Sequence, residues 1–362
     1  MKEAFHGSDI EKIEEIYGIP AEEIISFSAN VSPLGVSKKY LEGIKERLHC
    51  DEKYPDRDYK ALRKALGGYC GAKPENIIVG GGSSELIGAV IKHKKSPRVL
   101  ITAPAYAEYG RNVAIAGGRA DYFYLKSGEG FEFDTEALRE RLCGGYDILM
   151  ICSPVNPTST AISSAGIISL LEECERLGII CAVDETYVDF ADEGFDVSPL
   201  TDRYSCLFVI RSMSKFFCAP GLRLGYGITS DEELLHEITE NKDPWSVSSL
   251  SNEAAILMLS DVEYIREAKR YMSYERRRVC ERLDELKGIG ISYTRPEANF
   301  VLVRLPDKGP SSHELFELAL RERMMIRDCS DFKGLDDTYI RFCFMKSEDD
   351  DRLLELIKEA YS

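Results

Sequence analysis

The sequence contains no C-x-x-C pair. Its 11 cysteines are scattered through apolar stretches, as Cys152, Cys181 and Cys206 are. Zinc sites and disulfide frameworks both need clustered cysteines, so the spacing predicts no metal site and no disulfide scaffold. Reduced, buried thiols are typical of a reducing compartment, and we therefore expect a cytoplasmic protein.

Long hydrophobic runs are missing as well, because no apolar stretch approaches the ~20 residues of a membrane helix. The N-terminal residues, MKEAFHGSDIEKIEE, are too charged to predict a signal peptide. We find no internal repeat and no low-complexity segment. These absences favour a globular protein that does not enter a membrane.

Basic residues are outnumbered, since 46 Lys and Arg stand against 62 Asp and Glu and give a formal net charge of -16. An acidic surface repels nucleic acid and anionic membranes, so the sequence predicts neither as a partner. An anionic small molecule would need a local pocket of Arg, Lys and backbone N–H groups.

Apolar material is plentiful, because 44% of the 362 residues are hydrophobic. Short apolar runs alternate with amphipathic stretches such as Ser84–His93 and Ala165–Leu177. This alternation predicts an α/β fold with a largely parallel sheet. The candidate strands are Asn76–Val79, Arg98–Thr102, Asp147–Cys152, Ile179–Asp184, Cys206–Arg211 and Leu224–Thr229.

The C-terminal third has a different pattern, which begins with a long helical stretch from about Asn252 to Lys287. Two strands and two helices follow, and their order indicates a second, smaller α/β domain. We expect an N-terminal arm at residues 1–30, a large domain at 31–260 and a small domain at 261–362 that the arm completes. The later elements are the strands Asn299–Arg304 and Tyr339–Phe344 and the helices His313–Arg323 and Asp349–Tyr361.

A lysine motif carries the strongest chemical signal. Lys215 ends the segment SMSK directly after the expected strand Cys206–Arg211, and GLRLGY follows it with Arg223. Ligands of open α/β sheets bind beyond the carboxyl ends of the strands. A lysine there can form a Schiff base with an aldehyde, while Ser212, Ser214 and Arg223 suit a phosphate. The alternative is a solvated loop lysine.

Two neighbouring strand ends add polar groups. Asp184 ends an apolar strand, where it can hold a pyridine nitrogen protonated or cap the next helix. Tyr187 lies three residues further on and can reach a phenolic oxygen of the same ring. Asn156, between Pro154 and Pro157, can donate to that oxygen or belong to an ordinary Asn-Pro turn.

A glycine-rich turn, GGGSS at residues 80–84, separates an expected strand from a helix. Glycine lets the backbone approach a ligand, and a helix N-terminus attracts anions, so Gly82, Ser83 and Ser84 can cradle a phosphate. A tight turn is the alternative. The segment matches neither G-x-G-x-x-G nor a Walker loop, so nicotinamide and nucleoside triphosphates are not predicted. Tyr106 follows the next strand and can stack on a flat ring or pack in the core.

The chain resembles the fold-type-I pyridoxal-phosphate enzymes of the class I/II aminotransferase group. The resemblance lies in four motifs in the expected order, which are Asn156-Pro, Asp184-x-x-Tyr187, SxSK and GxRxGY. FSANVSPLG at residues 27–35 and YPD at 54–56 extend the similarity over essentially the whole chain. The resemblance implies a large domain with a mostly parallel central sheet sandwiched by helices, plus a smaller α/β C-terminal domain. It also implies pyridoxal 5'-phosphate (PLP) as the cofactor.

The resemblance further implies a role for each residue. Lys215 would form the Schiff base and carry protons, Asp184 would pair with the pyridine nitrogen, Tyr106 would stack on the ring, and Asn156 and Tyr187 would bind its phenolic oxygen. The cofactor phosphate would be held by Gly82, Ser83, Ser84, Ser212, Ser214 and Arg223, with Tyr54 from the partner subunit of a homodimer with shared active sites. The substrate would meet His6, Asn30, Asn156, Arg327 and Arg341, of which Arg341 takes its carboxylate.

Within the family, the chain is similar to the branch that holds histidinol-phosphate aminotransferases and threonine-phosphate decarboxylases. His6-Gly7, FFCAPGLR at 216–223, PWSV at 244–247 and IRDCS at 326–330 favour the decarboxylases. We expect decarboxylation of O-phospho-L-threonine, or a close phospho-amino acid, to an amino-alcohol phosphate in cobalamin biosynthesis. The alternative is transamination of histidinol phosphate with 2-oxoglutarate. A binding protein without catalysis is disfavoured, because Lys215 and Asp184 are both present.

Overall fold

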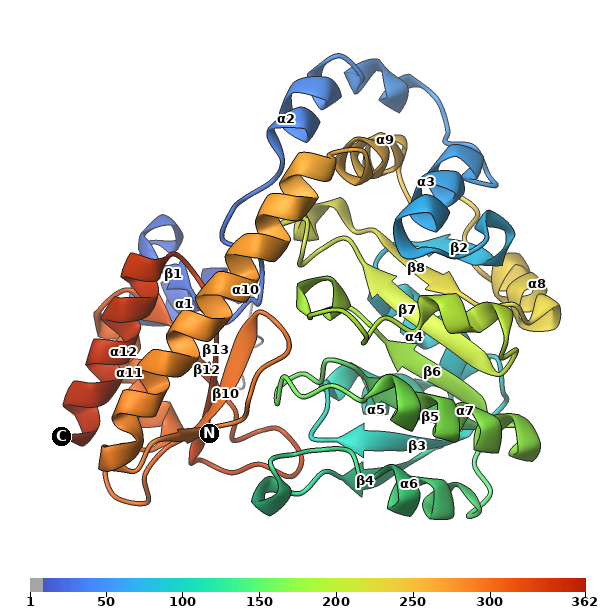
Figure 1. Cartoon of the computed structure of the whole chain (residues 1–362). Helices are drawn as coiled ribbons and strands as arrows, with labels where there is room; N and C mark the ends of the chain where they lie inside the picture. The colour runs from blue at the N-terminus through green and yellow to red at the C-terminus, as the bar shows by residue number, and fades with distance from the viewer. Residues whose placement is uncertain (1–8) are drawn as a thin grey trace.

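A computed structural model describes residues 9–362, and its larger part is built on a seven-stranded sheet (Figure 1). The strand order is β2-β8-β7-β6-β5-β3-β4, and only β8 runs antiparallel to its neighbours. The largely parallel sheet expected from the sequence is thereby confirmed. The strands are β2 (Ile77–Gly80), β3 (Arg98–Ala103), β4 (Arg119–Tyr124), β5 (Ile148–Cys152), β6 (Ile180–Asp184), β7 (Leu207–Ser212) and β8 (Gly225–Ile228).

Helices cover both faces of this sheet. The central strands β5 and β6 read ILMIC and ICAVD and are buried at every position, as strands covered on two faces are. On one face the core contains residues of α4 (Ser83–Lys92), α5 (Ala107–Ile115) and α8 (Glu232–Asn241). On the other face it contains residues of α3 (Lys60–Cys70), α6 (Thr135–Leu142) and α7 (Ser164–Leu177).

The C-terminal part contains an antiparallel sheet of order β12-β13-β10-β9. Near it, β1 (Ile25–Ser26) pairs in parallel with β11 (Met324–Met325), so the N-terminal segment lies among C-terminal elements (Figure 1). The predicted domain boundaries at residues 30 and 260 stay a proposal. The remaining elements here are α1 (Ile10–Tyr17), β9 (Ser292–Tyr293), β10 (Phe300–Arg304), α11 (Ser312–Arg321), β12 (Arg327–Asp328), β13 (Tyr339–Cys343) and α12 (Ser347–Tyr361).

The long helical stretch expected from Asn252 to Lys287 is two helices. These are α9 (Ser249–Leu259) and α10 (Val262–Glu285). Between them Asp261 accepts a hydrogen bond from the backbone N–H of Tyr264 at 3.2 Å and so begins a new helix. Strand β4 was not predicted, because it lies at the sheet edge and has no fully buried position to reveal a pattern. Helix α2 (Lys38–Lys45) was also not predicted.

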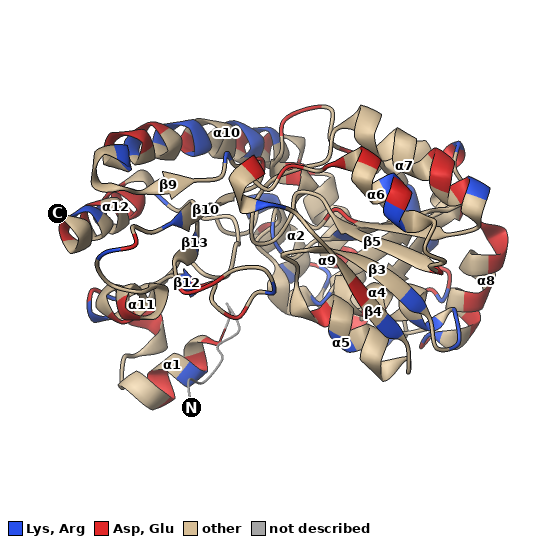
Figure 2. Ribbon diagram, turned by 90° about the horizontal axis from the view of Figure 1, so that it is seen from below, with Lys and Arg blue, Asp and Glu red and all other residues tan. Residues whose placement is uncertain are grey.

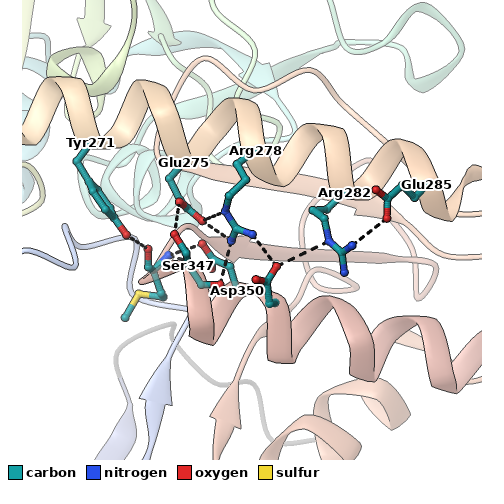
Figure 3. A network of polar contacts seen from close by, with 9 residues as sticks. Tyr271, Glu275, Arg278, Arg282, Glu285, Ser347 and Asp350 are labelled. Carbon is teal, nitrogen blue, oxygen red and sulfur yellow. Dashed lines mark hydrogen bonds and ion pairs between the residues drawn. The ribbon is translucent and has the colours of Figure 1, made fainter.

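A buried polar network joins α10 to α12 (Figure 3). The carboxyl groups of Glu275 and Asp350 are both inaccessible to solvent. Arg278 donates to Glu275 Oε1 at 2.8 Å and Ser347 Oγ donates to Glu275 Oε2 at 2.8 Å. Both helices carry acidic and basic residues along their length (Figure 2). In the part of the chain that the structure describes, no helix is both long and apolar enough to cross a membrane.

Candidate active site

The predicted strand-end residues meet at one edge of the large sheet. Strands β5, β6 and β7 are parallel neighbours, so their carboxyl ends lie side by side. Asp184 is the last residue of β6, while Asn156 and Lys215 follow β5 and β7 by a few residues. This edge is where open α/β sheets bind ligands.

Lys215 is partly buried, and its Nζ donates to the carbonyl oxygen of Ala29 at 2.7 Å. The pKa of Lys215 is lowered to about 8. Burial is the largest cause, and the nearby positive charges of Arg341 and Arg223 contribute to the same shift. An amine with such a pKa is partly neutral at physiological pH. It can therefore attack an aldehyde, as a Schiff-base lysine must.

Asp184 is buried, with 4% of its surface exposed, and each carboxylate oxygen accepts one hydrogen bond. The hydroxyl of Tyr109 donates to Oδ2 at 2.7 Å, and the backbone N–H of Thr186 donates to Oδ1 at 2.9 Å. Burial raises the pKa of Asp184, while the contacts with Thr186 and Tyr109 act in the opposite direction. Tyr109 was not predicted as a site residue, although it lies one helical turn after Tyr106.

Tyr187 faces the same space from the loop after β6. Its hydroxyl accepts a hydrogen bond from Asn30 Nδ2 at 3.4 Å, and its ring packs edge-on against Phe300 with centroids 4.9 Å apart. Burial raises the pKa of the Tyr187 hydroxyl above its ordinary value. Asn30 Oδ1 is buried and has no hydrogen-bond partner among the described residues. The structure thus brings together two predicted residues that are 157 positions apart.

Arg341 on β13 is a buried cation. Its guanidinium donates to Ser28 O at 2.6 Å and to Asn156 Oδ1, and it lies over the Phe300 ring. Burial lowers its pKa. Among the ion pairs of residues 9–362, none involves Arg341, and its Nε is buried without a partner. A buried guanidinium without an acidic neighbour is suited to an incoming carboxylate.

Arg327 lies opposite Arg341 in the β12–β13 pair. Unlike Arg341, it already has an acidic partner, because its Nη2 lies 2.7 Å from both carboxylate oxygens of Asp331. The guanidinium also lies over the Phe332 ring, 5.1 Å from the centroid. The predicted contact with a substrate anion would therefore compete with Asp331, and nothing in the sequence indicated this pairing.

The predicted phosphate residues gather at the start of α4. Gly82 has a φ of 100°, and a Cβ there would meet Arg223 Nη2 at 2.5 Å, so Gly82 leaves space for the guanidinium. Gly225 likewise lets β8 approach, because its Cβ would meet Ser83 N at 2.5 Å. The first N–H groups of a helix have no intrahelical partner, so those of Ser83 and Ser84 suit an anion. The N–H of Gly81 is taken by Glu85 Oε2.

The other predicted residues differ in their surroundings. Ser212 and Ser214 are buried, and the backbone N–H of Ser214 donates to Ser212 Oγ at 3.1 Å. Tyr106 packs at right angles to Tyr109, with ring centroids 5.8 Å apart. Tyr54 is 80% exposed and lies against Trp245 at 4.8 Å. His6 lies outside the described residues.

These residues fit PLP as a ligand. A lysine with a lowered pKa can bind its aldehyde, and a buried carboxylate can pair with its pyridine nitrogen. The start of α4, together with Arg223, can bind its phosphate. No ion pair among the described residues uses Lys215 or Arg223, so both cations are available for an anionic ligand. The fold and this set of residues define a PLP-dependent enzyme of fold type I.

The comparisons with known proteins place the chain more narrowly. Residues 22–357 match the model of the family "Aminotransferase class I and II". The chain belongs to this family, whose members work with PLP, and PLP is therefore its cofactor.

Its relatives have two different activities. It is 30% identical to the threonine-phosphate decarboxylase of Salmonella typhimurium over 98% of this chain and 96% of that protein. It is also 30% identical to the histidinol-phosphate aminotransferase of Methanothermobacter thermautotrophicus over 98% and 93%. The crystal structure of the histidinol-phosphate aminotransferase from Clostridium acetobutylicum matches with a TM-score of 0.86 and 34% identity, over 92% of this chain and 98% of that one.

Proposed function

We propose that the protein decarboxylates O-phospho-L-threonine, or a close phospho-amino acid, to an amino-alcohol phosphate. The observation that carries the proposal is the pair of guanidinium groups on β12 and β13. Arg341 is buried and has no acidic partner in the described part of the chain, and Arg327 is its neighbour across the strand pair. Such a substrate has a carboxylate and a phosphate, which together match two cations. The product would serve cobalamin biosynthesis in the cytoplasm.

Each residue then has a distinct task. When bound, PLP withdraws electrons from the α-carbon of an amino acid joined to it. Asp184 keeps the pyridine nitrogen protonated, and Asn156 and Tyr187 bind the phenolic oxygen. Lys215 holds the cofactor and later holds or returns a proton, with the carbonyl of Ala29 as the acceptor for its ammonium form. Tyr106 stacks on the ring.

Substrate orientation decides the outcome, because decarboxylation and transamination use the same lysine and aspartate. They differ in which bond of the α-carbon the site holds for cleavage. Arg341 holds the substrate carboxylate, while Arg327, Asn30 and His6 surround the remaining anionic group. In this proposal the phosphate displaces Asp331 from Arg327.

The second candidate is transamination of histidinol phosphate with 2-oxoglutarate. It is favoured by the 34% identity to a solved aminotransferase of that name. The same two arginines would then take the phosphate of one substrate and the carboxylates of the other. The segment with Trp245 and Ser246 favours the decarboxylase, because the aminotransferases usually carry Tyr-Asn there.

The proposal includes a homodimer with shared active sites. Tyr54 is 80% exposed within one chain. A tyrosine so exposed is free to contact the cofactor phosphate of a partner subunit, as the family resemblance implies. The exposed Trp245 lies against it and would accompany it into the interface.

A paired assay separates the two candidates. PLP-loaded protein is incubated with O-phospho-L-threonine alone and, separately, with histidinol phosphate plus 2-oxoglutarate. We expect CO2 from the first mixture without any keto-acid acceptor. Glutamate from the second mixture, with no CO2 from the first, would overturn the decarboxylase in favour of the aminotransferase.

A further inference from the structure

Tyr109 makes a contact that no family motif used above includes. It lies in the first turn of α5 and is 1% exposed, and its hydroxyl donates to Asp184 Oδ2 at 2.7 Å. The other oxygen of Asp184 accepts the backbone N–H of Thr186. Tyr109 is therefore a side-chain donor to this carboxylate.

The location of the contact makes it more than a structural hydrogen bond. Asp184 ends β6 at the edge where Lys215 and Asn156 also lie, and it is almost fully buried. A buried carboxylate is costly unless donors satisfy it, and a donor favours its charged form. Tyr109 also fixes the direction in which Oδ1 and Oδ2 point, because Oδ2 is held on one side.

The start of α5 carries both Tyr106 and Tyr109. Tyr106, proposed to stack on the ring, precedes Tyr109 by three residues, and the two rings are nearly perpendicular at 89°. A shift of α5 would therefore move the stacking tyrosine and the donor to Asp184 together. Cys152 is a further buried neighbour of this pair, and burial raises the pKa of its thiol to about 12, so it stays uncharged there.

We propose that Tyr109 is a positioning residue that keeps Asp184 ionised and turned toward the pyridine nitrogen of PLP. The inference rests on the proposed role of Asp184, but not on which reaction the enzyme performs. Without the hydroxyl, the buried carboxylate keeps the backbone N–H of Thr186 but loses the donor to Oδ2. The proton shared between the pyridine nitrogen and Asp184 then moves toward Asp184, and the ring becomes a weaker electron acceptor.

The test uses the holoenzyme without substrate. PLP labelled with ¹⁵N at the ring nitrogen is bound to wild type and to Tyr109→Phe, and the ¹⁵N chemical shift is followed with pH. We expect the wild-type signal to be that of a protonated pyridine and the variant signal to move toward neutral pyridine. The Kd for PLP should rise about 10-fold, as for the loss of one hydrogen bond to a charged group.

Tyr69→Phe is the matched control. The Tyr69 hydroxyl also donates to an aspartate, Asp189 Oδ1, at 2.7 Å, but Asp189 is paired with Arg211. This variant should lose similar stability and leave the ¹⁵N signal unchanged. An equal shift in Tyr69→Phe, or no shift in Tyr109→Phe, would overturn the proposal for Tyr109.

A third variant separates this inference from the role of Asp184. Asp184→Asn removes the carboxylate and should give the signal of neutral pyridine. If Asp184→Asn keeps the wild-type signal, the pairing of Asp184 with the ring nitrogen is wrong, and the proposal for Tyr109 falls with it. If only Asp184→Asn shifts the signal, Asp184 keeps its role and Tyr109 loses its own.

Discussion

At the scale of single residues, the site is defined by cations that have no acidic partner among residues 9–362, in a protein with excess negative charge. Lys215, Arg223 and Arg341 lie near enough that the two arginines lower the pKa of the lysine. The buried Arg211, by contrast, is neutralised by Asp189 at 2.6 Å. The positive charge left at the strand ends attracts an anionic cofactor and substrate.

The amine of Lys215 sets a pH dependence for cofactor loading. Only the neutral amine attacks an aldehyde, and its pKa in the protein is about 8. Addition of PLP to cofactor-free protein should therefore accelerate as the pH rises through about 8, measured by the growth of the visible absorption band.

Borohydride reduction identifies the lysine. After reduction, Lys215→Ala should carry no covalent cofactor in a mass spectrum. Lys242→Ala is a suitable control, because burial also lowers the pKa of Lys242, whose Nζ donates to the carbonyl oxygen of Asp243 at 3.0 Å. A reduced adduct in Lys215→Ala would show that the lysine assignment is wrong.

The two arginines of β12 and β13 should discriminate between the anionic groups of the substrate. Arg341→Gln should weaken binding of both L-threonine and O-phospho-L-threonine about 10-fold or more, because each loses its carboxylate partner. Arg327→Gln should weaken only the phosphorylated ligand. Titration calorimetry or the absorption change on binding measures both.

Asp331→Asn gives the complementary control. It removes the carboxylate that occupies Arg327 and should strengthen binding of the phosphorylated ligand alone. Equal effects of Arg327→Gln on both ligands would assign this arginine to the carboxylate instead of the phosphate.

At the scale of elements, α10 and α12 are joined by two buried carboxyl groups that together face one close arginine (Figure 3). Burial, followed by the interaction with Glu275, raises the pKa of Asp350 to about 9. The pair therefore holds a proton at neutral pH. Because the backbone N–H of Met345 donates to Asp350 at 3.0 Å, the pair also fixes the entry to α12.

This pair should make stability fall with rising pH. The unfolded chain ionises Asp350 near pH ~3.9, whereas the folded chain does so near 9, so the contribution is complete below about 4 and lost on the way to 9. Asp350→Asn removes this dependence. The melting temperature of wild type should drop more between pH 5 and 8 than that of the variant, as differential scanning calorimetry can measure.

The neighbouring Asp351 offers the control. It is half-exposed and pairs with Arg278 at 2.6 Å, so Asp351→Asn removes an acidic neighbour of the same arginine but leaves both buried carboxyl groups in place. Its melting temperature should follow the wild-type slope with pH. A wild-type slope in Asp350→Asn would mean that the buried proton belongs to another group.

At the scale of the whole molecule, distant parts of the chain build one site. The segment from Ser28 to Asn30 runs between the large sheet and the C-terminal sheet. Ser28 O binds Arg341, Ala29 O binds Lys215, and Asn30 binds Tyr187. The relative position of the two sheets therefore controls how far Lys215 lies from Arg341.

The proposed dimer can be tested by mixing inactive variants. If Tyr54 acts in the partner's site, a heterodimer of Tyr54→Phe and Lys215→Ala has one intact site. Random pairing puts half of the chains in such dimers, so about a quarter of wild-type activity should return. Tagged subunits establish that heterodimers form, and their complete inactivity would contradict a shared site.

The sequence alone determined the parts of the site whose signal is local. Lys215, Asp184 and Asn156 each follow a run of buried residues, and a polar group at the end of a parallel strand must lie at the ligand-binding edge. The family motifs then named the cofactor. The order of elements also determined the α/β class, since alternation of strand and helix needs no knowledge of contacts.

Only the tertiary structure decided which groups these residues meet. The hydrogen bond from Arg341 to Ser28 O joins residues 313 positions apart. Every residue has a backbone carbonyl, so the sequence does not indicate which one an arginine will bind. Packing between elements decides that Tyr109 donates to Asp184 and that Asp331 pairs with Arg327. It also decides that Arg341 has no acidic partner among the described residues. The electrostatic environment of a group is a sum over its neighbours in space. Those neighbours are distant in the sequence and come together only when the chain folds.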